Sequence, residues 1–258
     1  MPTTERTYTV KSKGVGLPDY AARAPLGQVR TGAISTLTDL AELAARLGSV
    51  VTFDRRGYVV LLDDFEDGIE SWESSIAGSG SLYWTAGRAE RGGFSMASQY
   101  SNGVREITRN LPVVPLGKNG LEVAFAWGVD TDTTMSFLLS YYAGATLLRG
   151  GARYSEADHA LYILDSTGAW VLVASDVRAG IPYIFNNIKF VTDFNTKKYE
   201  RLLFNGAEYD LSDHNLNEAV DASAPHMLIS LMPITTDLVS WTAWFDTVIV
   251  TQNEPANT

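Results

Sequence analysis

The stretch LLDDFEDGIESW, residues 61–72, holds the densest group of side chains that could do chemistry. Two leucines precede five carboxylates, which are Asp63, Asp64, Glu66, Asp67 and Glu70. Carboxylates this close together could act as catalytic acids, bind a hard cation through their oxygens, or form a solvated strand edge that resists pairing with other chains. The stretch by itself leaves these three interpretations open.

Tryptophan and tyrosine supply a second candidate chemistry, because their ring faces can stack on sugars. The same rings more often fill a protein core or an interface. Trp241 and Trp244 are an odd number of residues apart, so on a regular strand their side chains point to opposite sides. We name Trp84 and Trp241 as candidates for a glycan-binding platform, with core and interface packing as the alternative.

Other catalytic chemistry lacks the residues it needs. The chain has no cysteine, which excludes disulfides, thiolate zinc sites and a thiol nucleophile. Its three histidines fall outside the His-x-x-x-His and His-Glu-x-x-His spacings of metal sites, and no Gly-x-Ser-x-Gly sequence occurs. The short GVG and GSG sequences do not join a strand to a helix as a phosphate loop does. Nucleophilic and nucleotide chemistry are therefore not expected.

Charge and hydropathy exclude two classes of partner. The net charge of the 258-residue chain is −10, and Lys and Arg outnumber Asp and Glu only in its N-terminal part. An acidic body repels phosphates, so we expect no nucleic acid partner. No apolar run is long enough to span a membrane. The N-terminus lacks a signal-peptide pattern, so we expect the protein to be made in the cytoplasm without a signal peptide.

The N-terminal part is predicted to be an extended arm followed by one short helix. Residues 1–34 are punctuated by Gly and Pro and show no lasting periodicity. In STLTDLAELAARLG, leucines recur at helical spacing. Their apolar stripe, Leu40, Leu43 and Leu47, must dock on something for so short a helix to be stable, and the sandwich predicted below is the natural partner. The helix and its linker take up residues 35–57.

From about residue 58 the pattern predicts β-structure. Short runs rich in β-branched and aromatic residues alternate with turn signals such as DSTG, DFNTKK and NG. No helix-length period separates the runs, which excludes a parallel sheet built from βαβ units. About a dozen antiparallel strands of this kind are typical of a two-sheet sandwich. The clearest runs are 121–127, 135–142, 160–165, 169–175, 187–194, 199–204, 227–232 and 241–251.

Three of these segments resemble a known group of folds. LLDDFEDGIESW resembles the opening strand of concanavalin A-like jelly rolls, which include carbohydrate-binding modules and laminin-G-like domains. WFDTVIVTQ is similar to their closing strand, and IKFVTDFNTKKYERLLFNGAEYDL to a strand-turn-strand in their middle. The resemblance implies an all-β, two-sheet antiparallel jelly-roll sandwich over residues 58–252, with a tail at 253–258. It does not select a function, because this fold serves lectins, glycosidases and viral structural proteins.

The resemblance also implies a role for the acidic stretch. In many such domains the first and last strands are neighbours, and acids on both hold a structural calcium ion. The matching residues here are Asp64, Glu66 and Asp246. Calcium takes about six to eight oxygen ligands, several of them carboxylate. The alternative remains a solvated strand edge.

A third group of acids can be compared with the catalytic motif of a glycosidase. One family of jelly-roll glycosidases carries Glu-x-Asp-x-x-Glu on a single strand, which places its acids on one face. The nearest match is EYDLSD, with Glu208, Asp210 and Asp213, where an aspartate replaces the last glutamate. The group also follows the Asn-Gly turn directly instead of lying in mid-strand. We interpret these acids as polar residues at a strand end.

These observations predict a structural protein and no enzyme. We expect a virion component, such as a capsid decoration or fibre-associated protein. Its arm would contact other copies of the chain or a neighbouring shell protein. The alternative is a carbohydrate-binding module or adhesin that recognises a glycan.

Overall fold

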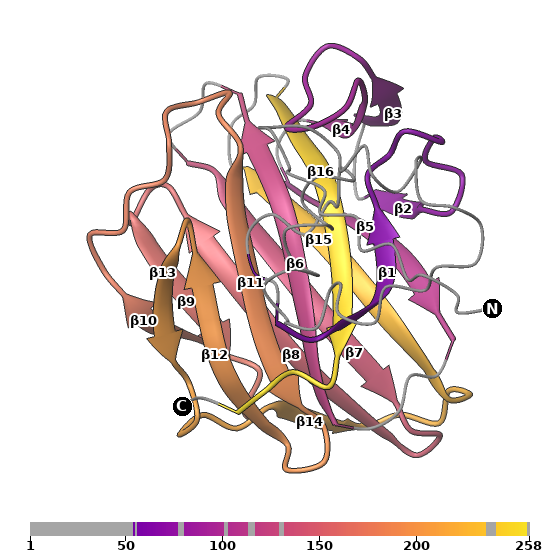
Figure 1. Ribbon diagram of the computed structural model, residues 1–258, viewed down its shortest axis with the longest axis vertical. Helices are drawn as coiled ribbons and strands as arrows, with labels where there is room; N and C mark the ends of the chain where they lie inside the picture. Colours follow the sequence, from indigo (N-terminus) through magenta and orange to yellow (C-terminus); the bar gives the residue numbers. More distant parts are fainter. Residues whose placement is uncertain are drawn as a thin grey trace, which may run out of the picture. The chain divides into compact units, whose positions relative to one another are not determined.

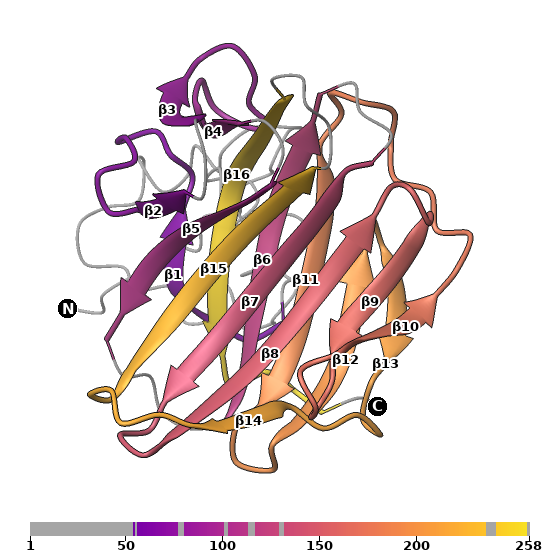
Figure 2. The ribbon, with the colours of Figure 1, turned by 180° about the vertical axis from the view of Figure 1, so that it is seen from behind.

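The regular structure of the described residues consists of β-strands, arranged as two antiparallel sheets of eight strands each (Figures 1 and 2). The predicted all-β, two-sheet sandwich is confirmed. The predicted arm, the helix and its leucines (Leu40, Leu43 and Leu47) lie outside the described residues. No helix in the described part of the chain is long and apolar enough to cross a bilayer. The computed structural model describes residue 54 and residues 56–76, 80–100, 103–112, 117–128, 132–235 and 241–256.

The first sheet is the one that Figure 1 views from outside. The last strand of the chain lies near its middle, and the first strand, β1 (Tyr58–Asp63), pairs antiparallel with that last strand. The expectation that first and last strands are neighbours is thus confirmed. The order of the other strands is β13 (Ala207–Asp210), β12 (Lys198–Phe204), β11 (Asn186–Asp193), β6 (Lys118–Trp127), β16 (Trp241–Gln252), β4 (Ser95–Tyr100) and β3 (Gly80–Thr85).

The second sheet is the one that Figure 2 views from outside. Its three central strands are β8, β7 and β15, and a short strand, β14 (Asn217–Val220), pairs with β8. Apart from β14, the strands of this sheet follow the order β10 (Trp170–Ala174), β9 (Ala160–Leu164), β8 (Thr146–Ser155), β7 (Thr134–Tyr142), β15 (His226–Thr235), β5 (Gly103–Leu111) and β2 (Glu73–Ile76).

The core lies between the two sheets and is built by alternation along each strand. From Leu121 on, every second residue of β6 is an apolar side chain of the core cluster, and the same holds along β7 from Met135. Phe125 of β6 meets Phe137 of β7 with ring centroids 5.0 Å apart, and Phe137 meets Phe245 of β16 edge-on. Because side chains alternate across a strand, the residues between these point to the outer face of each sheet.

Two hairpins follow the turn chemistry that the sequence predicts. Asn205 and Gly206 both have positive φ, 46° and 90°, as a two-residue turn between β12 and β13 requires. In the turn between β9 and β10, the Asp165 carboxylate accepts hydrogen bonds from the backbone N–H groups of Thr167 and Ala169, both at 2.9 Å. These local interactions fix the register of the strands on either side.

The acidic stretch is not all strand. β1 ends at Asp63, and Phe65 turns out of it with φ at 57° and a side chain buried in the core. The Asp63 carboxylate accepts hydrogen bonds from the Phe65 backbone N–H at 3.0 Å and the Trp72 indole N–H at 2.9 Å. It also pairs with Arg109 of β5 in the second sheet. Asp63 therefore shapes the turn and links the two sheets.

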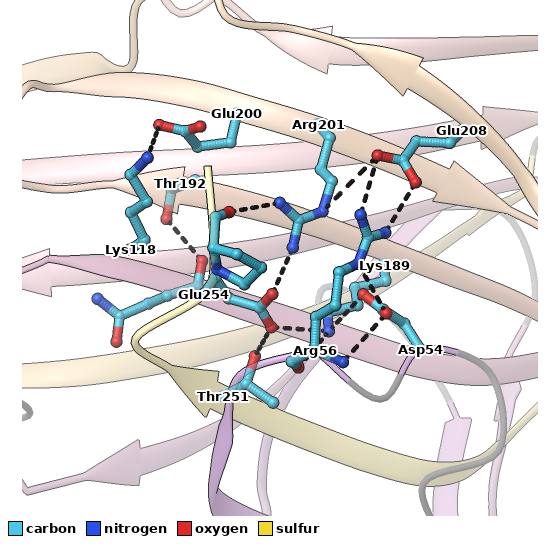
Figure 3. Close-up of polar contacts among 12 residues, drawn as sticks. Asp54, Arg56, Lys118, Lys189, Thr192, Glu200, Arg201, Glu208, Thr251 and Glu254 are labelled. Atoms are coloured by element: carbon cyan, nitrogen blue, oxygen red, sulfur yellow. Dashed lines mark hydrogen bonds and ion pairs between the residues drawn. The ribbon is translucent and has the colours of Figure 1, made fainter. Parts of the chain in front are cut away.

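The outer face of the first sheet carries a buried ion-pair cluster (Figure 3). Lys189 of β11 lies between the carboxylates of Asp54, at 2.8 Å, and Glu254, at 2.7 Å. Arg201 of β12 pairs with the same Glu254 and donates to the Pro255 carbonyl at 2.8 Å. All four charged side chains are buried, so each depends on its partners for solvation. The cluster fixes residues near both ends of the described chain to one sheet.

Candidate functional site

Two of the three predicted calcium ligands bind the same loop through hydrogen bonds. One oxygen of Glu66 accepts the backbone N–H groups of Gly93 at 2.8 Å and Phe94 at 2.9 Å. One oxygen of the buried Asp246 accepts those of Glu90 at 2.7 Å and Arg91 at 3.1 Å. The two carboxylates thus hold the connection between β3 and β4 over the end of the sheet.

The predicted calcium ligands do not converge on one point. The Asp64 carboxylate accepts the backbone N–H of Glu66 at 3.3 Å, and the other oxygen of Asp246 accepts that of Thr247 at 2.7 Å. Burial raises the pKa of Asp246 to about 6, although these backbone donors oppose the shift. Within the described ranges, no three acidic or histidine side chains group as they would around a metal ion. The calcium ion stays a prediction.

The two predicted glycan-binding tryptophans lie in different environments. Trp241 is only 4% exposed, and its ring meets Tyr100 edge-on inside the core, with centroids 5.3 Å apart. The prediction of Trp241 as a platform is therefore wrong, because a ring enclosed on both faces cannot stack on a ligand. Trp84 is 43% exposed, but one ring face is stacked on Phe94 at 3.8 Å. Its indole N–H donates to the Phe65 carbonyl, so it braces the turn after β1.

The outer face of the second sheet, the sheet nearer the viewer in Figure 2, differs from the first in the side chains along its strands. Along its central strands the outward residues include four small ones, Ser136 and Ser140 on β7, Gly151 on β8 and Ser230 on β15, which alternate with larger side chains such as Leu138. The outward side chains of these three strands, which the structure describes in full, include no carboxylate.

Two arginines on β8 bind serines of β7 in the same way. Arg149 lies opposite Ser140 and Arg153 lies opposite Ser136 in the β7–β8 register. Each arginine donates its Nε–H to the hydroxyl of its serine, at 3.2 Å for Arg149 and 2.8 Å for Arg153. The serines fix the two guanidinium groups close to the sheet and leave their terminal nitrogens directed elsewhere.

Trp170 of β10 packs beside the second arginine. The guanidinium carbon of Arg153 lies 3.9 Å from the centroid of the Trp170 ring, a cation–π arrangement. The ring reaches β8 because Gly151 has no side chain, and a methyl group there would contact the ring at 3.3 Å and collide with Leu138. Burial lowers the pKa of Arg153 to about 10, which still leaves it charged at neutral pH.

Aromatic side chains continue along the face on both sides. Tyr162 of β9 lies opposite Arg153, and its hydroxyl donates to Asp158 at 3.1 Å. Near Arg149, the rings of Tyr142 and His226 are stacked with centroids 4.1 Å apart and planes 7° from parallel. The face therefore offers two cations and several aromatic rings, one of which is stacked with Arg153. Such a surface can bind a ligand with apolar ring faces and hydroxyl or acidic groups.

The comparisons with known proteins agree on the fold. No family model matches the sequence, and no curated protein matches it. Among solved structures, an endo-β-1,4-glucuronan lyase from the fungus Trichoderma reesei has a TM-score of 0.52 at 11% identity, covering 75% of this chain and 95% of that chain. The family 22 carbohydrate-binding module of a Clostridium thermocellum protein has a TM-score of 0.41 at 15% identity, covering 77% and 96%. The Bacillus licheniformis β-glucanase has a TM-score of 0.44 at 12% identity, covering 76% and 99%.

The fold is a concanavalin A-like jelly roll. Identities this low report on the architecture of the chain alone, so the chemistry of this jelly roll has to come from its own side chains.

Sequence reasoning did not find the site because it did not find β8. The segment TLLRGGARYS has two adjacent glycines and two arginines, and it lacks the apolar alternation of the other strands. A signal was nevertheless present, since arginine, glycine and arginine at every second position place all three on one face. Ser-x-Leu-x-Ser on the preceding strand repeats the same spacing.

Proposed function

We propose that the protein is a non-catalytic glycan-binding protein, which holds a sugar chain on the outer face of the second sheet. The observation that carries the proposal is the indole of Trp170, partly exposed and stacked with Arg153. An aromatic ring fixed in this way offers apolar area at little entropic cost, and hydroxyls and guanidinium groups around it can bond to sugar hydroxyls.

The proposal of a non-catalytic role rests on the residues of the same face. Hydrolysis of a glycosidic bond uses two carboxylates on either side of the bond. The outward side chains of β7, β8 and β15 provide none. The matched structures are named as carbohydrate-binding modules, a lyase, a glucanase and a carbohydrate esterase, so their names do not select between binding and a reaction.

The test is binding to a panel of immobilised polysaccharides by the wild type and Trp170→Ala. Loss of one stacked ring should weaken binding by about tenfold, equivalent to ~1.4 kcal/mol, while the melting temperature changes by only a few degrees. Trp84→Ala is the matched control, because it removes an exposed tryptophan from the other sheet and should leave binding unchanged. The polymer recovered after incubation should keep its chain length.

Two results would overturn the proposal. One is a wild-type protein that binds no polysaccharide of the panel, and the other is a Trp170→Ala variant that binds as well as the wild type. The expected virion component stays a prediction, because the arm on which it depends lies outside the described residues.

A further inference from the structure

The two Arg–Ser pairs on the second sheet form a repeat along β7 and β8. The Arg149–Ser140 and Arg153–Ser136 pairs are separated by a pair of small and apolar residues, Gly151 and Leu138. Four residues along a strand place the two arginines ~13 Å apart on the same face. The Nε–H of each guanidinium is bound to a serine, so the two terminal nitrogens of each group remain as donors.

Neither arginine has a carboxylate partner among the residues that the structure describes. Other cations of the sandwich do have one, including Arg56, Arg109 and Arg201. The pKa of Asp221 is lowered chiefly by its hydrogen bonds with Ser223. Arg149 makes the smallest contribution to that shift, and it forms no ion pair with Asp221. Two cations on one face without acidic partners give that face a local positive charge, in a chain whose net charge is −10.

The surroundings of Arg153 favour the arrival of an anion. Its guanidinium is partly withdrawn from water by Trp170 and the sheet, and this burial lowers its pKa to about 10. Removing a cation from water without a partner is unfavourable. A carboxylate at the terminal nitrogens would offset that cost, and a planar carboxylate matches the geometry of two parallel guanidinium N–H groups.

We propose that this face binds an acidic polysaccharide, with carboxylates of different sugar units held by Arg149 and Arg153. The ring faces of the sugars would contact Trp170 and Tyr162 at one end and the Tyr142–His226 stack at the other. The proposal rests on the glycan-binding function above and adds the class of ligand, a chain of uronic acid units.

The experiment compares each acidic polymer with its own neutral form. Polygalacturonate and alginate are tested beside the same polymers after reduction of their carboxyl groups to alcohols, by isothermal calorimetry at two salt concentrations. The wild type should bind the acidic forms at least about tenfold more tightly. That preference should shrink as salt increases, because screening weakens charge–charge attraction at an exposed face.

Variants assign the preference to the two arginines. Arg153→Met and Arg149→Met keep most of the side-chain volume and should each lose the preference for the acidic form, while binding of the neutral form persists. Arg88→Met is the matched control, since Arg88 also lies over aromatic rings, those of Tyr183 and Trp244, but on the first sheet. If Arg153→Met does not fold, Arg149→Met still decides, because Arg149 does not support Trp170.

The outcomes separate this inference from the function on which it rests. Equal binding of acidic and reduced polymers, or arginine variants that keep the preference, would overturn the acidic ligand and leave glycan binding in place. Binding of sulfated heparin without binding of either uronate polymer would also overturn it, because it would show a sulfate site. A protein that binds none of these polymers but binds another polysaccharide of the panel would also overturn the acidic ligand, whereas one that binds no polysaccharide at all would remove the glycan-binding function.

Discussion

Glu122 shows how its neighbours determine the chemistry of one residue. It lies on the outer face of the first sheet, directly opposite Lys189 in the β6–β11 register, and is 1% exposed. Lys189 is turned toward Asp54 and Glu254, so neither oxygen of Glu122 has a hydrogen-bond partner. Burial raises the pKa of Glu122 to about 7, and the charge of Lys189 only partly opposes this shift.

The raised pKa of Glu122 predicts a stability that falls with pH. Because the folded state keeps the proton of Glu122 to higher pH than the unfolded state, the contribution of Glu122 to stability is most favourable below pH ~4.5 and decreases as the pH rises toward about 7. Glu122→Gln removes the ionisation and should raise the free energy of unfolding at pH 8 by up to about 3 kcal/mol. At pH 4.5 it should have little effect. Urea unfolding at both pH values measures the difference.

A carboxylate elsewhere on the same sheet provides the comparison. Glu208 is exposed and pairs with Arg56 at 2.8 Å, so Glu208→Gln should lose no more than about 1 kcal/mol and gain nothing at pH 8. A Glu122→Gln protein that is less stable than the wild type at pH 8 would show that Glu122 is paired in solution.

At the scale of elements, the loop between β3 and β4 is where the calcium prediction applies. Glu66 and Asp246 hold that loop through four backbone N–H groups, and Gly92 makes room for the Glu66 carboxylate with φ at 62°. If calcium binds here as the sequence resemblance implies, EDTA should lower the melting temperature, and added calcium should restore it, because the ion binds only the folded state. An unchanged melting temperature, with no calcium found by metal analysis, would contradict the prediction.

The elements also show how far the sequence alone reaches. The turns after β9 and β12 could be predicted from it, because turn residues such as Asn205 and Gly206 act locally, and the resemblance to jelly rolls supplied the pairing of the first and last strands. β8 could not be predicted in this way, because its glycines are required by contacts with residues far away in the sequence. A methyl group on Gly150 would collide with Thr192 of the first sheet, and one on Gly151 would collide with Leu138. The burial of Trp241 is likewise decided by which side of β16 faces the core.

At the scale of the whole sandwich, the two outer faces differ in the partners of their charged side chains. On the first sheet, cations and carboxylates neutralise one another in a buried cluster that holds Asp54 and Glu254 (Figure 3). On the second sheet, the two arginines meet serine hydroxyls and aromatic rings instead. Paired charges suit a structural role, whereas cations without acidic partners suit a ligand. The first described residue, Asp54, is thus anchored on the sheet opposite to the proposed glycan face.

This separation predicts that the N-terminal arm and the glycan face act independently. Deleting residues 1–34 leaves Asp54, Arg56 and every described contact of the sandwich in place. We expect the truncated protein to fold with an unchanged melting temperature and to bind polysaccharide like the full chain.

If the arm joins copies of the chain, as the sequence-based hypothesis holds, the truncated protein should also lose any assembly that the full chain forms. Light scattering after size-exclusion chromatography measures the mass of each species. Assembly that survives the deletion would refute the role of the arm, and lost glycan binding would show that the site extends beyond the second sheet.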